Sequence, residues 1–506
     1  MIRDWSSIKI QFCNFYGTNM EVASFPAFDL NSNEPLQHQI HQQFVSLIAQ
    51  GRLTSGLRLP STRKLSEILQ VSRNTIVLVI EQLKMEGFVY SQTGRGTFIS
   101  NDIPDVISIS NTQKQASKTT KPEKRSQFMA LSQLGETMKK LSVSSALTLP
   151  FTPGVPDLKH FPHKIWHKLV RQHQDRTVLM GYDDPQGYLP LREALVSYLS
   201  LSRGVNCKAE NILITQGSQQ AISLCSQILL NEGDMLLHEN PGYQGANRAF
   251  STSKPFVQPV PLKNNSIDVD WMINHCEKLS ESKIIYTTPA HQYPMGGLLP
   301  ASDRLRLINW ATENNKWILE DDYDSEYHFN HKPIAAMQGM TKHNNVIYMG
   351  SFSKTLFPAL RLGYLILPDE LIRPFTVAKS YLTGDLPLLN QAVVADFIMQ
   401  GHFVRHLRKM RKQYKEKFLH FEQLINTVLK TKVNIIAESA GMHLVIEIPN
   451  INDVQLKNKL YEHGFGSSAL SSYYLNDEIK TGLVLGFANT TEENRMDLVE
   501  LLDKIL

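Results

Sequence analysis

The spacing of apolar residues changes along the chain and divides it into segments. In PLQHQIHQQFVSLIAQGRL (35–53) apolar residues recur every three or four positions, as on one face of a helix. LPSTRKLSEILQVSRNTIVLVIEQLKMEGFV (59–89) predicts two more helices around a break at QVS, with Ser61 and Ser72 placed to cap them. VYSQTGRGTFIS (89–100) then predicts two short strands joined by a Gly-Arg-Gly tip.

Beyond this compact segment the apolar pattern stops and later resumes in another form. The stretch SNTQKQASKTTKPEKRSQ has almost no apolar residues and cannot bury a core, which is typical of a linker. After it, strand-like and helix-like runs alternate to the C-terminus, as in an α/β domain with a mainly parallel sheet. We therefore expect four parts: an irregular leader (1–33), a compact domain (34–104), a polar linker (105–149) and an α/β domain (150–506).

Composition narrows the class of protein. A hydrophobic fraction of 42% and a charged fraction of 20% are ordinary for a globular chain, and 506 residues suggest two or three domains. The four cysteines lie far apart without CxxC spacing, so neither a disulfide framework nor a metal site is expected. No apolar run approaches the roughly 18 residues of a membrane span, and the first residues lack a signal-peptide pattern. The sequence therefore favours a cytoplasmic protein that does not associate with membranes.

Charge is informative locally rather than overall. The net charge of +4 is too small to indicate a nucleic-acid partner by itself, but residues 34–100 carry seven Lys/Arg against four Asp/Glu. The helix after QVS begins Ser-Arg-Asn-Thr, polar groups placed where a recognition helix meets bases and phosphates. Arg95, between two glycines, can bring its guanidinium close to a phosphate or into a minor groove. A helical hairpin with solvated ends is the alternative, but three helices and a basic hairpin in this order favour a DNA-binding winged helix.

The phrases LPSTRKLSE, VSRNT and GRGTF resemble the GntR family of bacterial winged-helix regulators across nearly all of 34–100. The resemblance implies a double-stranded DNA operator as partner. The residues expected to contact DNA are Arg63, Ser72, Arg73, Asn74, Thr75 and Arg95.

In the second half, SFSKTLFPALRLGY (351–364) combines groups that suit an aldehyde cofactor carrying a phosphate. Ser351 and Ser353 offer hydroxyls, and Arg361 offers a guanidinium fork that fits phosphate. A lysine near cationic or desolvating groups loses its proton more readily and can form an imine with an aldehyde, which makes Lys354 the candidate.

Three further segments fit the same cofactor, although each has a simpler interpretation. NILITQGSQQAISLCSQILL (211–230) predicts a strand, a glycine turn and a helix whose first N–H groups can bind phosphate, but many α/β units share this pattern. KWILEDDYDSEY (316–327) runs an apolar strand into two aspartates, which are either solvated loop acids or include a partner for a pyridine nitrogen. Tyr243 in ENPGYQ can stack on a flat ring, although a tyrosine after a turn is more often packing.

The order and separation of these segments resemble fold-type I pyridoxal-phosphate enzymes, the aspartate aminotransferase fold, across about 150–506. The resemblance implies pyridoxal 5′-phosphate as cofactor, Lys354 as its Schiff-base lysine, and a small C-terminal α+β domain. GYDDPQGYLPLREAL (181–195) also matches, with Tyr182 reaching the phosphate of a partner subunit, so a homodimer is expected. One departure is Tyr293, which stands where the family has an asparagine that bonds to the ring oxygen. The remaining cofactor residues implied are Gly217, Ser218 and Gln219 with Ser351, Ser353 and Arg361 around the phosphate, Tyr243 on the ring, Asp321 at the pyridine nitrogen and Tyr323 near the ring hydroxyl.

A GntR-like winged helix followed by such a domain resembles the MocR-type regulators, and PAHQYPMGG and EDDYDSE are close to the wording of that group. This implies a transcriptional regulator that senses a small amine, or pyridoxal phosphate itself. The alternative is an active aminotransferase with an accessory DNA-binding domain. Amino-acid aminotransferases hold the substrate carboxylate with an arginine of the small domain, and after Arg411 only Arg495 remains, on what looks like the solvated face of a terminal helix. The clamp is therefore expected to be absent, which favours the regulator and leaves residual transamination open.

The basic run RHLRKMRKQYKEK (405–417) has two interpretations. Its helical spacing favours a solvated helix face. The alternative is a second DNA-facing surface on the large domain.

Overall fold

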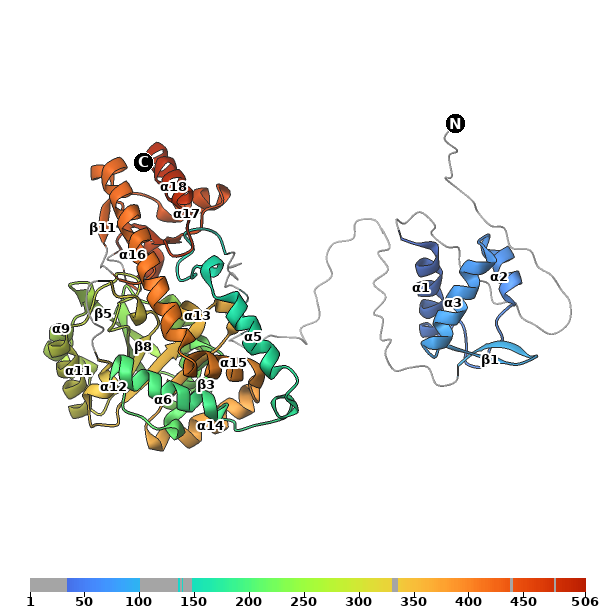
Figure 1. Ribbon diagram of the computed structural model, residues 1–506, viewed down its shortest axis with the longest axis horizontal. Coiled ribbons are helices and arrows are strands. Elements are labelled where there is room, and N and C mark those ends of the chain that lie inside the picture. The colour runs from blue at the N-terminus through green and yellow to red at the C-terminus, as the bar shows by residue number, and fades with distance from the viewer. Residues whose placement is uncertain are drawn as a thin grey trace. The chain divides into compact units, whose positions relative to one another are not determined.

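The computed structural model describes residues 34–100, 135, 136, 139, 148–329, 335–436, 440–476 and 479–506 (Figure 1). Its contacts divide the chain into two units, Met1–Phe128 and Met129–Leu506. The expected leader (1–33) and most of the expected linker (105–149) lie outside the described residues.

The first unit contains three helices and a two-stranded antiparallel hairpin, in which Val89 pairs with Ile99. A bridge between Arg58 and Phe98 adds a third short segment to the hairpin. The elements are α1 (Leu36–Ala49), α2 (Thr62–Leu69), α3 (Arg73–Met85), β1 (Val89–Gln92) and β2 (Gly96–Ile99).

Local signals explain where these helices begin. The Ser61 hydroxyl accepts a hydrogen bond from the Lys64 N–H at 3.3 Å, and the Ser72 hydroxyl accepts one from the Thr75 N–H at 3.1 Å. Between the caps, Gln70 adopts a left-handed conformation that ends α2 and turns the chain. The predicted helix–turn–helix and wing are therefore confirmed. One apolar core joins them, including the fully buried Leu65, Ile76, Val79, Leu83 and Ile99.

The second unit is built on an eight-stranded sheet of order β3-β10-β9-β8-β7-β4-β5-β6. Strands β9, β8, β7, β4 and β5 are parallel neighbours, whereas β10 is antiparallel to β3 and β9, and β6 is antiparallel to β5. The predicted α/β class with a mainly parallel sheet is confirmed. The strands are β3 (Ile212–Thr215), β4 (Met235–Asn240), β5 (Phe256–Lys263), β6 (Ser266–Ile267), β7 (Ser282–Thr287), β8 (Trp317–Asp322), β9 (Val346–Ser351) and β10 (Gly363–Ile366).

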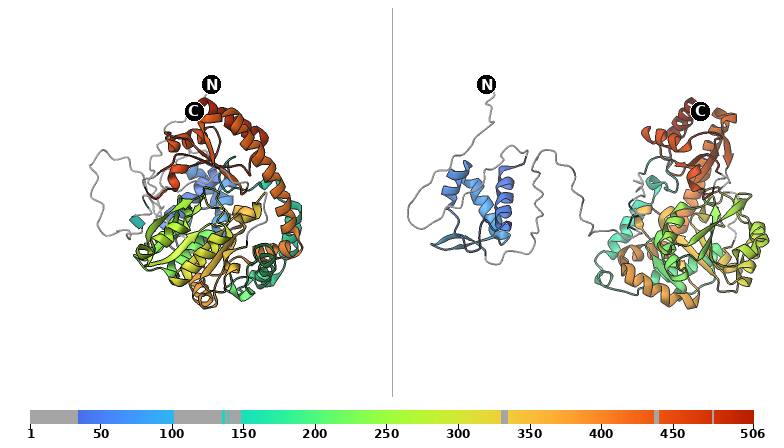
Figure 2. Two further views of the ribbon diagram at one scale, coloured as in Figure 1. Left: turned by 90° about the vertical axis from the view of Figure 1, so that its left-hand side faces the viewer. Right: turned by 180° about the vertical axis from the view of Figure 1, so that it is seen from behind.

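A smaller antiparallel sheet of order β11-β12-β14-β13 follows, and its elements gather at one end of the second unit (Figure 2). It carries α17 (Asp453–Glu462) and α18 (Glu492–Ile505), which gives the expected small C-terminal α+β part. The strands are β11 (Asn434–Ile436), β12 (His443–Glu447), β13 (Ser468–Ala469) and β14 (Gly482–Gly486).

Helices surround the large sheet, and the long α16 (His402–Val428) packs against both α15 and α18 and so links the two sheets. None of the helices among the described residues is long and apolar enough to cross a membrane. The other helices are α5 (His163–His173), α6 (Leu189–Arg203), α7 (Ser218–Leu229), α8 (Gln244–Phe250), α9 (Val269–Asn274), α10 (Cys276–Leu279), α11 (Ala301–Glu313), α12 (Met337–Met340), α13 (Phe352–Thr355), α14 (Asp369–Thr383) and α15 (Leu388–Met399).

The structure corrects the interpretation of Arg495. Its side chain is buried rather than solvated, because α18 packs against α16. Its Nε atom donates to Nδ1 of His420 at 3.0 Å, and Nη1 donates to the Thr490 hydroxyl at 3.0 Å. The expectation that Arg495 lies on the solvated face of the terminal helix is therefore wrong.

The basic run at 405–417 lies on α16, which has a buried apolar face and an exposed basic face. Two of its cations are used within the unit. Arg411 Nε donates to the Glu326 carbonyl at 2.8 Å, and Lys417 pairs with Asp157 at 2.7 Å. The solvated-face interpretation fits the exposed basic side chains of this run, namely Arg405, Arg408, Lys409 and Lys412, whereas Lys415 is half-buried.

Candidate functional site

A cavity of about 280 Å³ opens where the parallel strands of the large sheet end. Loops after the carboxyl ends of parallel strands commonly bind ligands, because the strands deliver their following residues to one edge of the sheet. Here the C-terminal sheet contributes to the wall as well. The lining includes Gly154, Ser218, Gln219, Tyr243, Tyr286, Tyr293, Asp321, Tyr323, Asp324, Ser351, Ser353, Lys354, Arg361 and His443.

Lys354 stands on the short helix α13, directly after β9. Ser351 caps this helix by accepting a hydrogen bond from the Ser353 N–H at 3.1 Å. The Lys354 Nζ atom donates to the carbonyl of Gly154 at 2.8 Å. Burial lowers the pKa of the Lys354 amine, against the attraction of Asp324 and Asp321. The amine is therefore held inside the cavity in a setting that favours its reactive, neutral form.

Gly154 makes room for this lysine. Its φ of +75° lies in the left-handed region, and a Cβ atom there would sit 2.3 Å from Lys354 Nζ. The sequence analysis did not select this glycine, since nothing within TPGVPD refers to a lysine 200 positions away.

An anion cradle lies between β3, α7 and Arg361. Gly217, with φ of +82°, precedes the N-terminus of α7, where Ser218 and Gln219 present free N–H groups. A Cβ on Gly217 would contact the Arg361 guanidinium at 3.6 Å, so that cation covers the turn. Arg361 itself has a φ of +50° and donates to the Gln216 carbonyl at 3.0 Å, which fixes its position. These groups are suited to a phosphate.

The two aspartates at the end of β8 face opposite sides of the sheet, as successive strand residues do. Asp322 pairs with Arg203 at 2.7 Å and accepts from the Tyr348 hydroxyl at 2.7 Å, so it belongs to the core. Asp321 lines the cavity and accepts from the Tyr286 hydroxyl at 2.6 Å. Burial raises the pKa of Asp321 to about 7, which suits a carboxyl that shares a proton with a ring nitrogen.

Aromatic side chains supply flat walls. Tyr243 lines the cavity, its hydroxyl accepts from Gln219 at 3.3 Å, and its ring meets that of Tyr293 edge to face. Tyr323 also lines the cavity, but its hydroxyl lies 2.9 Å from Nδ1 of His291. Tyr182 is not brought to this cavity; it is 97% exposed on the single chain.

One part of the wall was not selected from the sequence. Asp324 and His443 line the cavity, and Asp324 accepts from His291 Nδ1 at 3.0 Å. Asp324 and His291 lie within segments quoted for their resemblance, EDDYDSE and PAHQYPMGG. His443 heads β12 in the C-terminal sheet, and only the fold brings it to the cavity.

Pyridoxal 5′-phosphate fits this donor set part by part. The cradle with Arg361 suits a dianionic phosphate, the raised pKa of Asp321 suits a pyridine nitrogen, and Lys354 suits an aldehyde. The fit does not depend on the residue at position 293, where Tyr293 bonds to the Tyr473 hydroxyl at 3.1 Å.

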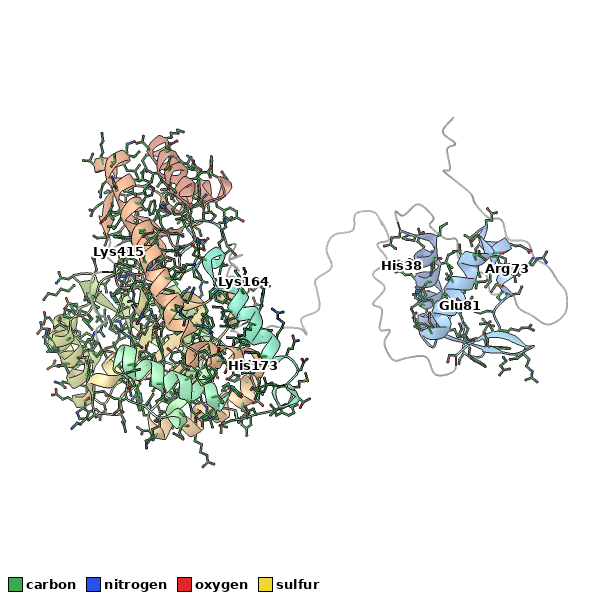
Figure 3. All side chains as sticks on the ribbon, viewed as in Figure 1. His38, Arg73, Glu81, Lys164, His173 and Lys415 are labelled. Carbon is green, nitrogen blue, oxygen red and sulfur yellow. The ribbon has the colours of Figure 1, made fainter. Side chains whose placement is uncertain are left out.

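The candidate nucleic-acid interface is on the first unit. Arg63, Arg73 and Asn74 are exposed, Thr75 is half-buried, and Arg73 projects from the start of α3 (Figure 3). Arg95 is exposed at the tip of the wing. Arg58 is a further candidate, because its guanidinium lies against Gly96 of the wing. It was not selected from the sequence. The exposed arginines therefore come from α2, α3, the hairpin tip and the segment before α2.

Comparison with protein families matches both units. Residues 151–502 match the family described as aminotransferase class I and II. Residues 36–99 match bacterial regulatory proteins of the gntR family.

Two curated relatives span nearly the whole chain. The chain is 35% identical to the probable rhizopine catabolism regulatory protein MocR of Rhizobium meliloti, over 91% of each chain. It is 27% identical to the HTH-type pyridoxine biosynthesis transcriptional regulator PdxR of Corynebacterium glutamicum, over 94% of this chain and 98% of that one.

A solved structure matches the second unit. LysN, the α-aminoadipate aminotransferase of Thermus thermophilus, complexed with N-(5′-phosphopyridoxyl)-L-leucine, superposes with a TM-score of 0.65 at 27% identity. The match covers 70% of this chain and 91% of LysN.

Proposed function

Because this chain belongs to the MocR-type transcriptional regulators, in which a gntR-family domain precedes an aminotransferase class I and II domain, we propose that its second unit senses a small amine. The chain is a pyridoxal 5′-phosphate-dependent, DNA-binding regulator. The observation that carries the sensor proposal is a cavity lined by Lys354, Asp321 and Arg361 in a chain that also has a winged helix.

The cofactor is held by the groups of this cavity. Pyridoxal 5′-phosphate supplies an aldehyde that captures amines and a ring that withdraws electrons. Lys354 provides the amine that joins the aldehyde, and Asp321 holds a proton at the ring nitrogen. Tyr243 would stack on the ring, and Tyr323 would lie near the ring hydroxyl. The phosphate is bound by Gly217, Ser218, Gln219, Ser351, Ser353 and Arg361.

A homodimer completes this site. In a single chain Tyr182 is almost fully exposed, which is unusual for a large aromatic side chain. The partner subunit's Tyr182 would then reach the phosphate, and both sites of a dimer would be completed in the same way.

DNA is bound in the cytoplasm by the first unit. Arg73, Asn74 and Thr75 at the start of α3 enter the major groove of an operator, with Ser72 capping the helix beneath them. Arg63 at the start of α2 and Arg95 at the wing contact the flanking backbone. Two winged helices on one dimer would read two half-sites.

The amine acts by changing what Lys354 contacts. A ligand shifts a regulator only if it binds its two arrangements unequally. If the ligand amine took the place of Lys354 at the cofactor aldehyde, the freed Lys354 amine could return to the Gly154 carbonyl or pair with Asp324. Pyridoxal phosphate itself can act as the signal in the same way, since its binding occupies Lys354.

Active transamination is the second candidate, because the cavity contains the lysine, the acid and the anion cradle that such enzymes use. One observation weighs against it. Among the described residues that line the cavity, Arg361 is the one arginine, and it belongs to the phosphate cradle. A carboxylate clamp separate from the cradle is therefore missing, and an ordinary α-amino acid would be held poorly.

Turnover separates the two candidates. The full chain loaded with pyridoxal 5′-phosphate is mixed with common amino acids and a keto-acid acceptor, and keto-acid formation is followed with the visible spectrum. A regulator should change its spectrum with little product. Product formation at an ordinary enzyme rate, about 1 per second or more, would establish the aminotransferase instead.

A further inference from the structure

Three residues beside the cofactor site are not among those assigned above to the cofactor, although His291 contacts the Tyr323 hydroxyl at 2.9 Å. Asp324 follows β8, His291 lies in the loop after β7, and His443 begins β12 of the C-terminal sheet. Their relative exposures are 2%, 3% and 4%, so each is buried. One ligand atom from each lies within 4.8 Å of the others. We refer to His291, Asp324 and His443 as the acceptor cluster.

The hydrogen bonds of the acceptor cluster show which of its atoms can accept a further hydrogen bond. The Nε2 atom of His443 lies 2.9 Å from the Pro294 carbonyl, which can only accept, so the proton is on Nε2. Burial lowers the pKa of His443 to about 4, and the ring is neutral at pH 7. Its Nδ1 atom therefore carries a lone pair.

The Asp324 carboxylate can also accept further hydrogen bonds. Both of its carboxylate oxygens lie at 3.0–3.1 Å from the same donor, Nδ1 of His291. A carboxylate can accept about four hydrogen bonds, and within the described parts of the chain no other side chain is hydrogen-bonded to Asp324. A buried carboxylate with spare lone pairs is costly unless a donor approaches it.

The charges around the cavity indicate which donor is missing. The Lys354 amine lines the same cavity as Asp324, but its Nζ atom donates to the Gly154 carbonyl. Asp324 is nevertheless the charge that most raises the pKa of the Lys354 amine, so carboxylate and amine face the same space. The other cationic side chain of the lining, Arg361, covers the anion cradle.

We propose that the acceptor cluster binds a second polar group of the effector amine, and that this group is a hydrogen-bond donor, an ammonium or a hydroxyl, and not a carboxylate. The inference rests on the proposed function, in which the first amino group is captured at the cofactor. An ammonium or hydroxyl satisfies the Asp324 carboxylate and the His443 lone pair together. A carboxylate would meet Asp324 as a like charge.

This assignment also connects ligand binding to a structural change. Asp324 follows β8 of the large sheet, whereas His443 is the first residue of β12 in the C-terminal sheet. A donor group bound between them therefore ties the two sheets together. An amine without the second group would occupy the cavity without bridging Asp324 and His443.

The test is an equilibrium titration of the full chain loaded with pyridoxal 5′-phosphate, followed by its visible spectrum. The probes are n-alkylamines of three to five carbons and the matching α,ω-diamines, amino alcohols and ω-amino carboxylates. At the best length, the diamine or the amino alcohol should bind about tenfold or more tightly than the alkylamine, since each offers the cluster a donor. The carboxylate should bind more weakly than the alkylamine. The diamine and amino-alcohol arms show which donor is preferred.

Asp324→Asn should reduce the affinity for the preferred donor to that for the alkylamine, while the alkylamine itself still binds. The matched control is Asp396→Asn. Asp396 accepts a hydrogen bond from His173 at 2.9 Å, so the two form a similar aspartate–histidine pair. His173 is the last residue of α5 (Figure 3), and neither residue lines the cavity. That variant should keep the wild-type preference.

Three results would overturn the assignment: tightest binding by the carboxylate, an unchanged preference in Asp324→Asn, or a preference that EDTA abolishes and zinc restores. The last would make the acceptor cluster a metal site. Failure of the proposed function looks different, because then even simple alkylamines would leave the spectrum of the loaded protein unchanged.

Discussion

The two units place their functional side chains in opposite environments. In the first unit, Arg63, Arg73 and Arg95 are exposed; serines cap the helices that present Arg63 and Arg73, and Arg95 lies in the turn between β1 and β2. In the second unit, Lys354 is half-buried and Asp321 is buried, and each is bonded to a group from a distant segment. In the first unit the DNA-binding side chains contribute little to folding. In the second unit each functional side chain is also part of the packed interior.

This difference sets how each unit should respond to mutation. An exposed arginine can be removed without leaving a cavity or an unpaired buried group. The affinity for DNA should then fall while the free energy of unfolding stays nearly unchanged. A buried lysine or aspartate cannot be changed so cleanly, because burial shifts its pKa and its neighbours depend on it. The following tests run from the largest expected effect to the smallest.

Lys354→Ala should abolish covalent attachment of the cofactor. Wild-type protein treated with borohydride should retain pyridoxal 5′-phosphate through denaturation, whereas the variant should retain none, as judged by absorbance and mass. A second buried lysine provides the check. Lys379 on α14 also has a pKa lowered by burial, to about 8, so cofactor that remains attached in Lys354→Ala would point to it and show Lys354 to be misassigned.

Asp321 should make the cofactor-free protein less stable as the pH rises. Burial raises the pKa of Asp321 from 3.8 to about 7, so between those values the folded state binds more protons than the unfolded state. Stability contributed by the protonated form is present at low pH and is lost as the pH passes through 7. Denaturant unfolding of Asp321→Asn should lack this loss, which is of the order of a few kcal/mol. Parallel pH profiles for the two proteins would rule the shift out.

Gly154→Ala should weaken cofactor binding by about tenfold, since the new Cβ would displace the Lys354 amine from its present position. Gly233→Ala is the matched control. Gly233 also has a positive φ, +86°, but no atom lies within 4 Å of its Cβ position. Both variants should lose about 1 kcal/mol of stability through backbone strain, and Gly154→Ala alone should bind the cofactor more weakly. Equal cofactor affinity in the two would remove Gly154 from the site.

Arg73→Ala should weaken DNA binding about tenfold and change the free energy of unfolding by less than about 0.5 kcal/mol. Fluorescence anisotropy on a duplex selected from random sequences measures the first quantity, and thermal unfolding measures the second. Arg373→Ala, at an exposed position of α14, is the control and should change neither. If affinity falls alike for all sequences, Arg73 contacts phosphate; if one base position becomes tolerant, it reads that base.

The same contrast explains what could be predicted from the sequence. The first unit follows from neighbours in the chain, since the caps at Ser61 and Ser72 and the Gly-Arg-Gly tip are local signals. For the second unit, the strand into Asp321 and the turn at Gly217 were also local and were found. Gly154 and His443 were not, because their place depends on how distant segments meet. Arg495 was misread for the same reason: its polar neighbours suggested solvent, but α16 covers it.

The central claim is that the second unit, which holds the cofactor, controls DNA binding by the first unit through Lys354. Its direct test is the affinity of the full, cofactor-loaded chain for its selected duplex, measured by anisotropy with and without a saturating amine. We expect the amine to change that affinity at least about fivefold. Lys354→Ala should still bind DNA but show no change on adding the amine. An amine response that survives in Lys354→Ala would contradict the account.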